Sequence, residues 1–327
     1  IEYGIAAWKG ALRAQKSERI DIIEGTETGM LLLTLLWKRS PVIIRLHGEQ
    51  YTFHKYTPEM RLTAGVRLSR VLQRIALRRA DGLISPSEAH ASEISKELGA
   101  TQPLCVIPNC VDVPDQAKAS KDRDESLVLF VGRLDRVKGV KVFLEAAALV
   151  VKGFPKARFV VAGTSHPTLP PEEIESIIGK HPLKDQVRLT GYVGPDELGD
   201  LYERSAVCVV PSYYESFGLA ALEAMAHGLP VIAARAGGLP EIVEDGISGR
   251  LVPSGEAQAF ASAIVEILSD DAKRTQMSVA ARRRAQAHFS IERINRMNLN
   301  VFEELRSRSQ VSRQFDERSS IVAPRAT

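Results

Sequence analysis

The feature that most constrains the fold is a regular alternation of short apolar runs with amphipathic helical patterns. The helical patterns carry apolar residues at three- and four-residue spacing, as at Val142, Leu144, Ala147 and Val151. Such alternation is typical of parallel sheets covered by helices on both faces, so we predict an α/β protein. The predicted strands are 20–24, 42–46, 82–85 and 104–107, followed by 127–131, 158–162, 187–189, 207–210, 231–233 and 249–252.

A polar, highly charged segment with one proline divides this alternation into two blocks. We therefore predict a first domain at 1–113, a linker at 114–126 and a second domain at 127–289, which suits a chain of 327 residues. The first domain has fewer predicted strands and is expected to be incomplete. A helical pattern occupies 290–306, and loss of periodicity predicts a disordered tail at 307–327.

Composition excludes several classes of protein. The net charge is only +3, which argues against wholesale binding to a phosphate backbone, so no nucleic-acid partner is expected. The apolar run at 30–37 is far shorter than the ~20 residues of a membrane-spanning helix. Cys105, Cys110 and Cys208 fit neither a disulfide framework nor a zinc site, which favours the cytoplasm. The chain begins with Ile1, so we expect processing or a missing natural beginning.

Two glutamates follow the predicted strand at 207–210. Glu215 lies in the loop, and Glu223 lies in a helix predicted to begin near Phe217 or Gly218. This is the carboxyl edge of the sheet, where ligands bind. The helix N-terminus suits an anion such as a diphosphate, and the carboxylates suit hydroxyl groups of sugar or ribose. The alternative is that Glu215 compensates the helix dipole and Glu223 is solvated.

A second loop at this edge, after the strand at 127–131, carries Arg133 and Lys138. Both cations are predicted to reach the same anion through charge-assisted hydrogen bonds, although loop cations are often simply solvated. A third edge loop, 236–243, contains two glycines that permit tight turns beside a ligand.

Several segments together resemble the retaining glycosyltransferases of family 4, also called group 1. They are Gly132-Arg133-Leu134 with Lys138-Gly139, Glu215-Ser216-Phe217-Gly218 with Glu223, the stretch 228–232, and 237–241. The resemblance covers about 104–305. It implies the GT-B fold, in which two Rossmann-like domains face a cleft, and a helix at 290–306 that crosses back to the first domain.

The resemblance also implies roles for individual residues. Arg133 and Lys138 would hold the donor diphosphate, and Glu223 would bind the nucleotide ribose. Glu215, catalytic with His47, Arg133 and Lys138, would hold the donor sugar. The remaining predicted donor-binding residues are Gly132, Tyr192 near the base, Phe217, Gly218 and Leu219.

His47 at a strand end resembles a family histidine that faces the donor sugar, although a lone histidine after a strand is more often structural. Cys110 stands where the family usually has glycine. Family members also open with a strand and a glycine-containing loop. Nothing before residue 20 shows that pattern, so several tens of residues are expected to be absent, and transfer by this chain could be impaired.

The predicted function is hexose transfer, with anomeric retention, from a UDP or GDP sugar to a glycan, lipid-linked or small-molecule acceptor in cell envelope polysaccharide biosynthesis. No cofactor or metal is expected, because two cations and a helix end can stabilise the leaving diphosphate. The alternative is a truncated or inactive donor-binding protein. A glycosidase carboxylate pair would leave the phosphate-binding cations unexplained, and a GT-B epimerase or phosphorylase fits the motifs less well.

The segment 55–79 is rich in basic residues that recur at helical spacing beside apolar ones. It is predicted either to contact anionic lipid headgroups on the inner face of the membrane or to be a solvated helix face.

Overall fold

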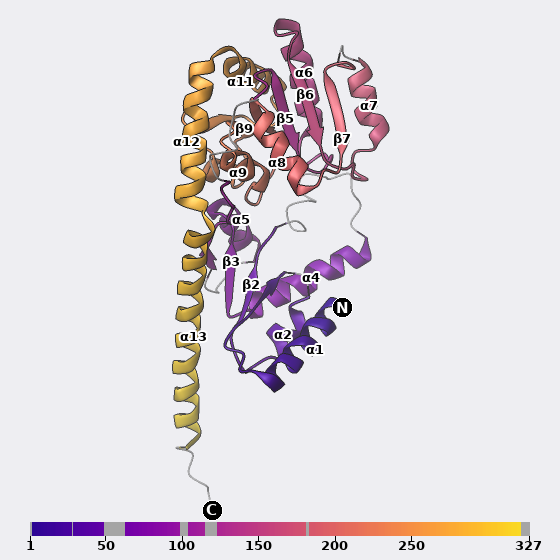
Figure 1. Cartoon of the computed structure of the whole chain (residues 1–327). Coiled ribbons are helices and arrows are strands. Elements are labelled where there is room, and N and C mark those ends of the chain that lie inside the picture. Colours follow the sequence, from indigo (N-terminus) through magenta and orange to yellow (C-terminus); the bar gives the residue numbers. More distant parts are fainter. Residues whose placement is uncertain are drawn as a thin grey trace, which may run out of the picture. The chain divides into compact units, whose positions relative to one another are not determined.

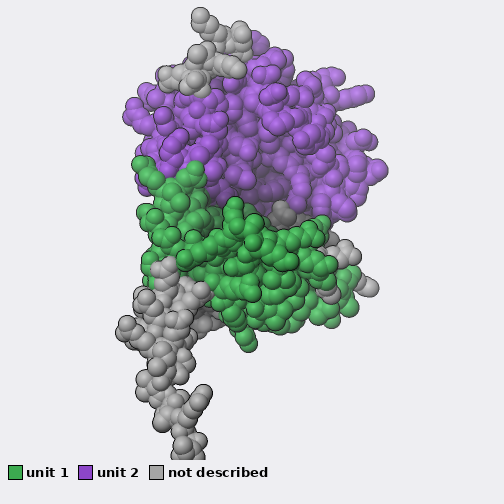
Figure 2. Space-filling view, turned by 60° about the horizontal axis from the view of Figure 1, so that its bottom comes forward, with its two compact units in different colours: residues 1–48, 62–108, 294–327 green, residues 49–61, 109–293 purple. Residues whose placement is uncertain are grey.

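The computed structural model describes residues 2–27, 29–48, 63–98, 104–114, 123–180 and 183–321. The chain divides into two compact units, coloured separately in Figure 2. Unit 1 contains residues 1–48, 62–108 and 294–327, and unit 2 contains residues 49–61 and 109–293. Each unit is built on its own parallel sheet, which confirms the predicted α/β fold with two parallel-sheet domains.

Unit 2 contains a six-stranded sheet with the order β10-β9-β8-β5-β6-β7. The chain builds outward from β5 through β6 to β7, and then returns to the other side of β5 to add β8, β9 and β10. The strand order therefore reverses between β5 and β8, as in the Rossmann fold. The strands are β5 (Leu127–Val131), β6 (Arg158–Ala162), β7 (Val187–Gly191), β8 (Val207–Val210), β9 (Val231–Ala234) and β10 (Gly249–Val252).

Helices connect these strands and enclose the main hydrophobic core. Strands β8 and β9 are buried along their whole length, which explains why they are continuous apolar runs and not alternating ones. Helix α6 packs against α11, and α12 packs along α9 (Figure 1). The helices are α6 (Val140–Gly153), α7 (Pro171–Lys180), α8 (Pro195–Arg204), α9 (Leu219–Ala226), α10 (Leu239–Ile242), α11 (Ala257–Ser269) and α12 (Asp271–Phe289).

Unit 1 contains a four-stranded parallel sheet with the order β1-β2-β3-β4. Ile43, Ile84 and Ile107 from this sheet region form a small core with Ile294 of α13, which explains why the last helix belongs to this unit from residue 294 onward. The elements are α1 (Glu2–Ser17), β1 (Ile23–Thr26), α2 (Leu31–Leu36), β2 (Val42–Arg45), α4 (Ala64–Arg79), β3 (Gly82–Ser85), α5 (Glu88–Leu98), β4 (Leu104–Val106) and α13 (Ile291–Ile321).

Each predicted strand is present, most of them within one or two residues of the predicted bounds, and two differences are larger. Strand β1 begins at Ile23 and not at residue 20, because its register with β2 pairs Ile23 with Val42. The segment 307–321, predicted to be disordered, is helical, since α13 continues to Ile321. Neither glycine nor proline interrupts 291–321. Parts of the predicted linker (115–122), of the basic segment (55–62) and of the tail (322–327) lie outside the described residues.

Candidate functional site

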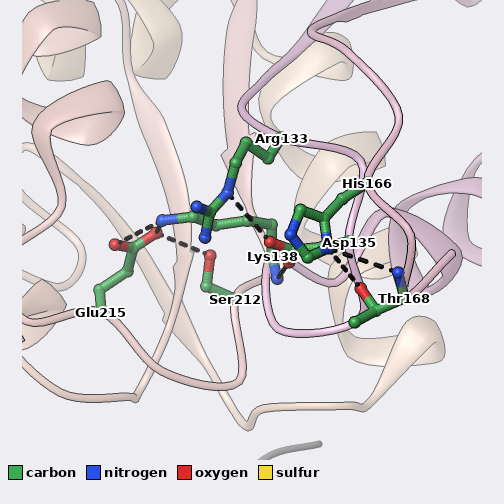
Figure 3. Close-up of polar contacts among 7 residues, drawn as sticks. All are labelled: Arg133, Asp135, Lys138, His166, Thr168, Ser212 and Glu215. Carbon is green, nitrogen blue, oxygen red and sulfur yellow. Dashed lines mark hydrogen bonds and ion pairs between the residues drawn. The ribbon is translucent and has the colours of Figure 1, made fainter. Parts of the chain in front are cut away.

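The loops that follow β5 and β8 meet at the reversal of strand order in unit 2. The β5–α6 loop carries Arg133 and Lys138, and the β8–α9 loop carries Glu215. Lys138 reaches across to Glu215, and its Nζ lies 2.8 Å from Oε1 and 3.0 Å from Oε2 of the carboxylate (Figure 3). Ser212 donates its hydroxyl to Oε1 of Glu215 at 2.9 Å. Two residues predicted to act together are therefore in direct contact.

Asp135 fixes the loop that carries the two cations. Its side chain is fully buried, one oxygen accepts the backbone N–H of Lys138 at 2.7 Å, and the other accepts Nε of Arg133 at 3.2 Å (Figure 3). A buried carboxylate is retained when it is paired and hydrogen-bonded. Asp135 thus holds both cationic residues in one turn, a role that the sequence analysis missed although the residue lies within the motif.

His166 and Thr168 lie on the neighbouring loop after β6 (Figure 3). The backbone N–H of His166 donates to the carbonyl of Leu134 at 3.3 Å, and its Nδ1 lies 3.0 Å from Oγ1 of Thr168. The loop after β6 therefore also helps to hold the β5–α6 loop in place. Neither residue belongs to a motif predicted from the sequence.

Two glycines with positive φ allow these loops to pack backbone against backbone. At Gly139 (φ 72°) a Cβ atom would lie 2.2 Å from the carbonyl oxygen of Pro211. At Gly237 (φ 52°) a Cβ atom would lie 1.9 Å from the carbonyl oxygen of Glu215. Any larger residue must move the loop. Gly237, in the third edge loop, therefore allows that loop to pack against the β8–α9 loop.

Glu223 lies on the second turn of α9, which begins at Leu219 after the N-cap Gly218. Tyr202 of α8 donates its hydroxyl to Oε2 of Glu223 at 2.9 Å. Burial raises the pKa of the Glu223 carboxyl, and the hydrogen bond from Tyr202 partly opposes that increase. Tyr202 is only 2% exposed. Because Tyr202 lies in a different helix from Glu223, no local sequence pattern predicts their contact.

The other predicted donor-binding residues have different environments. Phe217 is buried and packs edge-on against Phe289, so its side chain belongs to the core. Only its backbone is available to a ligand. Tyr192 follows β7 and is 79% exposed, and Leu219 is exposed on the first turn of α9. The N–H of Gly132 donates to the carbonyl of Ala162 at 3.0 Å, which ties the β5–α6 loop to β6.

His47 belongs to unit 1, where it follows β2. Its side chain is exposed, and its backbone N–H donates to Oε1 of Glu27 at 2.5 Å. The N–H of Gly48 donates to the same oxygen at 2.9 Å. The catalytic role assigned to His47 stays a prediction.

Among the described residues, no group of three or more His, Cys, Asp or Glu side chains is arranged to hold a metal ion. None of the helices in this described part of the chain is long and apolar enough to cross a membrane. Metal independence remains a prediction.

Two parallel-sheet units, with charged loops at the strand-order reversal of the second, define a protein of the GT-B class. The chain belongs to the glycosyl transferases group 1 family, whose model matches residues 113–284. The model described as glycosyltransferase family 4 matches residues 1–114. These matches confirm the resemblance found in the sequence motifs.

Similar curated proteins include D-inositol 3-phosphate glycosyltransferases. The one from Nocardiopsis dassonvillei is 35% identical over 222 residues, which cover 63% of this chain and 52% of that protein. The one from Corynebacterium urealyticum is 31% identical over 253 residues, covering 72% of this chain and 59% of that protein. The chain spans about half the length of the curated relatives it matches.

Solved structures support the same fold. Sucrose-phosphate synthase from Thermosynechococcus elongatus has a TM-score of 0.76 at 27% identity, with 90% of this chain and 76% of that chain covered. Anabaena HepE in complex with UDP-glucose has a TM-score of 0.76 at 24% identity, with 91% and 82% covered. The similarity to HepE, at 24% identity, is evidence for the fold alone.

Proposed function

We propose that this protein transfers a hexose from a nucleotide-diphosphate sugar to an acceptor hydroxyl, with retention of the anomeric configuration. The observation that carries the proposal is the contact of Lys138 with Glu215 at the strand-order reversal of unit 2. It places a cation and a carboxylate beside the amino end of α9. That combination suits a substrate with a diphosphate and a hydroxyl-rich sugar.

Lys138, Arg133 and the N-terminus of α9 would bind the diphosphate. Glycosyl transfer builds negative charge on the leaving diphosphate, so the catalyst needs fixed positive groups aimed at that charge. Arg133 and Lys138 are held by the buried Asp135, which limits their reorganisation. Because these cations come from the protein, we propose that the reaction needs neither a divalent metal nor a resident cofactor.

Glu223 would accept hydrogen bonds from the ribose hydroxyls of the nucleotide. Its carboxylate is held by Tyr202 and lies on the same helix whose amino end would meet the diphosphate. Glu215 would accept hydrogen bonds from the donor sugar. These assignments give the two glutamates separate tasks, one on each side of the diphosphate.

The acceptor is proposed as a glycan, a lipid-linked sugar or a small polyol. The curated relatives named for D-inositol 3-phosphate support a hydroxyl-rich small acceptor, and the family supports a sugar acceptor in general. A role in cell envelope polysaccharide synthesis in the cytoplasm, with UDP or GDP as the donor nucleotide, is part of this proposal.

A nucleotide-sugar screen tests the proposed function. We expect UDP or GDP, and one of their sugars, to raise the melting temperature of the protein, because a ligand that binds the folded state stabilises it. Lys138→Ala should reduce the shift, because it removes a cation that would bind the diphosphate. Lys141→Ala, an exposed lysine on the first turn of α6, is the matched control and should preserve it. No shift with any nucleotide would contradict the proposal.

Transfer itself needs a second measurement. Proton NMR of the first product formed should show the anomeric configuration of the donor, and added EDTA should not change the rate. Nucleotide binding without transfer or donor hydrolysis would favour the alternative, a donor-binding protein without transfer activity. An inverted product would contradict retention.

We also propose that α4 contacts anionic membrane surfaces. Leu68, Val71 and Ile75 are exposed at 56%, 55% and 39% and lie at helical spacing on one face. Exposed Arg67 and Arg74 lie on the same helix. An apolar stripe flanked by arginines is typical of interfacial helices.

Vesicle sedimentation tests this contact. The protein should bind vesicles containing phosphatidylserine and not pure phosphatidylcholine vesicles, and Val71→Glu should weaken binding. The control Leu299→Glu places the same charge at an exposed position on α13 and should have no effect. Equal binding to both vesicle types would contradict an electrostatic contact.

A further inference from the structure

A polar cavity lies in unit 2, at the carboxyl end of α9. Its volume is about 640 Å³, and it is lined by residues from α12, from the chain leading into β5 and from the end of α9. The proposed donor site is at the amino end of the same helix, beside Gly218. We refer to this space as the arginine cavity. Among its lining residues are Arg123, Arg274, Arg282, Arg283, His227 and Glu125.

The arginine cavity has an excess of positive charge. Arg274 pairs with Glu125 at 3.3 Å and with Asp271 at 2.8 Å. Within the described part of the chain, no carboxylate lies within ion-pair distance of Arg123, Arg282 or Arg283. Glu203 lies 3.6 Å from Nδ1 of His227. Four guanidinium groups therefore lie near three carboxylates, which leaves an excess of one positive charge.

Two of these arginines are held in place by backbone carbonyls at the end of α9. Arg282 donates to the carbonyl of Ala226 at 3.0 Å, and Arg123 donates to the carbonyl of Gly228 at 3.1 Å. Cations at a helix C-terminus are favourable by themselves, so capping explains part of this arrangement. It does not explain Arg283, which lines the cavity without such a bond among the described contacts.

Part of this positive charge, at Arg123, is removed from solvent. Burial and the neighbouring Arg274 lower the pKa of Arg123, and Glu203 partly opposes that decrease. Nε of Arg123 is buried and has no hydrogen-bond partner among the described residues. An anion in the cavity would offset the repulsion between the guanidinium groups.

We propose that the arginine cavity binds a phosphate-bearing small molecule, at a site separate from the Lys138 and Glu215 site. Guanidinium groups bind phosphate oxygens in pairs, and each carries five donors, so arginines already bonded to carbonyls retain donors for a ligand. The volume of about 640 Å³ lies within the usual range of ligand pockets. The ligand is therefore expected to carry an organic group in addition to phosphate.

Calorimetric titration with inorganic pyrophosphate tests the site. The titration uses the full chain with Lys138→Ala, because pyrophosphate would otherwise also bind the proposed donor site. We expect binding to persist in this background and to weaken about tenfold when Arg123→Gln or Arg283→Gln is added, since each removes charge-assisted hydrogen bonds. Arg188→Gln, an exposed arginine on β7, is the matched control and should leave binding unchanged.

Two outcomes would overturn the proposal. One is complete loss of pyrophosphate binding in the Lys138→Ala background. The other is equal binding by the Arg283→Gln and Arg188→Gln proteins. Arg123→Gln also removes a bond to α9, so its melting temperature is measured in parallel. Arg283 is exposed, and its substitution keeps the test valid if Arg123→Gln fails to fold.

Discussion

The ammonium group of Lys138 is held by both carboxylate oxygens of Glu215, 77 positions later in the chain, at 2.8 and 3.0 Å. The ion pair is largely shielded from solvent, since the Glu215 side chain is 11% exposed and that of Lys138 is 27% exposed. Any anionic ligand that approaches Lys138 must therefore share the ammonium with Glu215. This competition sets how the two residues respond to substitution.

Glu215→Gln should separate binding from transfer. The amide keeps the shape of the side chain but removes the negative charge beside Lys138, so a nucleoside diphosphate should bind at least as tightly as to the unaltered protein. Transfer should fall by at least about tenfold if Glu215 holds the donor sugar. Calorimetry with UDP or GDP and a product assay measure the two effects. Binding weakened more than about tenfold would show that Glu215 supports the diphosphate site instead.

Gly237→Ala should disrupt the site without changing any charged group. The added Cβ would lie 1.9 Å from the carbonyl oxygen of Glu215, at a φ of 52°, so the β8–α9 loop must move. We expect a loss of about 2 kcal/mol or more in the free energy of unfolding, and loss of nucleotide binding. Gly179→Ala is the control, because no atom lies within 4 Å of its added Cβ in α7. Its stability should stay the same or rise slightly, and equal behaviour of the two variants would contradict the packing argument.

Tyr202→Phe should destabilise the protein in a pH-dependent way. The hydroxyl of Tyr202 bonds the ionised Glu223 carboxylate, and its removal should cost about 1–2 kcal/mol at neutral pH. Removing this hydrogen bond should also raise the pKa of Glu223 further above its ordinary value. The cost should therefore shrink as the pH falls through the raised pKa of Glu223, and it should be smaller at pH 4 than at pH 7. Chemical unfolding at pH 7 and pH 4 tests this.

Tyr213→Phe is the matched control for that experiment, because its ring is 40% exposed and its hydroxyl makes no described hydrogen bond. Its stability should change little at either pH. A pH-independent cost for Tyr202→Phe would mean that the hydroxyl contributes only through packing.

His90 should make the protein less stable as the pH falls from 6.5 towards 4. Burial, opposed in part by Glu93, lowers the pKa of His90 from 6.5 to about 4. In that window the unfolded chain binds a proton that the folded protein does not, so the free energy of unfolding decreases as the pH falls, by roughly 3 kcal/mol in total. Urea unfolding at several pH values measures this slope.

His90→Asn should reduce this slope relative to the unaltered protein. His288→Asn, at the exposed end of α12, provides the control and should leave the slope unchanged. An unchanged slope in His90→Asn would assign the pH dependence to carboxylates instead.

The fold was largely predictable because its signals are local. Central strands such as β8 and β9 are continuous apolar runs, and the loops between them carry glycines and charges that mark the carboxyl edge of a parallel sheet. The position of β1 was less predictable, because it depends on pairing with β2. The extension of α13 was missed because its last turns are polar and lack an apolar period.

The sequence by itself determined the class of fold, the order of the elements and the charged residues at the sheet edge, including Lys138 and Glu215. The apolar periodicity, the positions of the glycines and the charges depend only on residues that are near one another in the chain, so they can be read directly from the sequence. Only the tertiary structure decided that Asp135 fixes the cationic loop, that Tyr202 holds Glu223, and that Arg123 lies at one cavity with three arginines of α12. These relationships depend on distances between segments far apart in the chain, which are set when the sheet and its helices pack together.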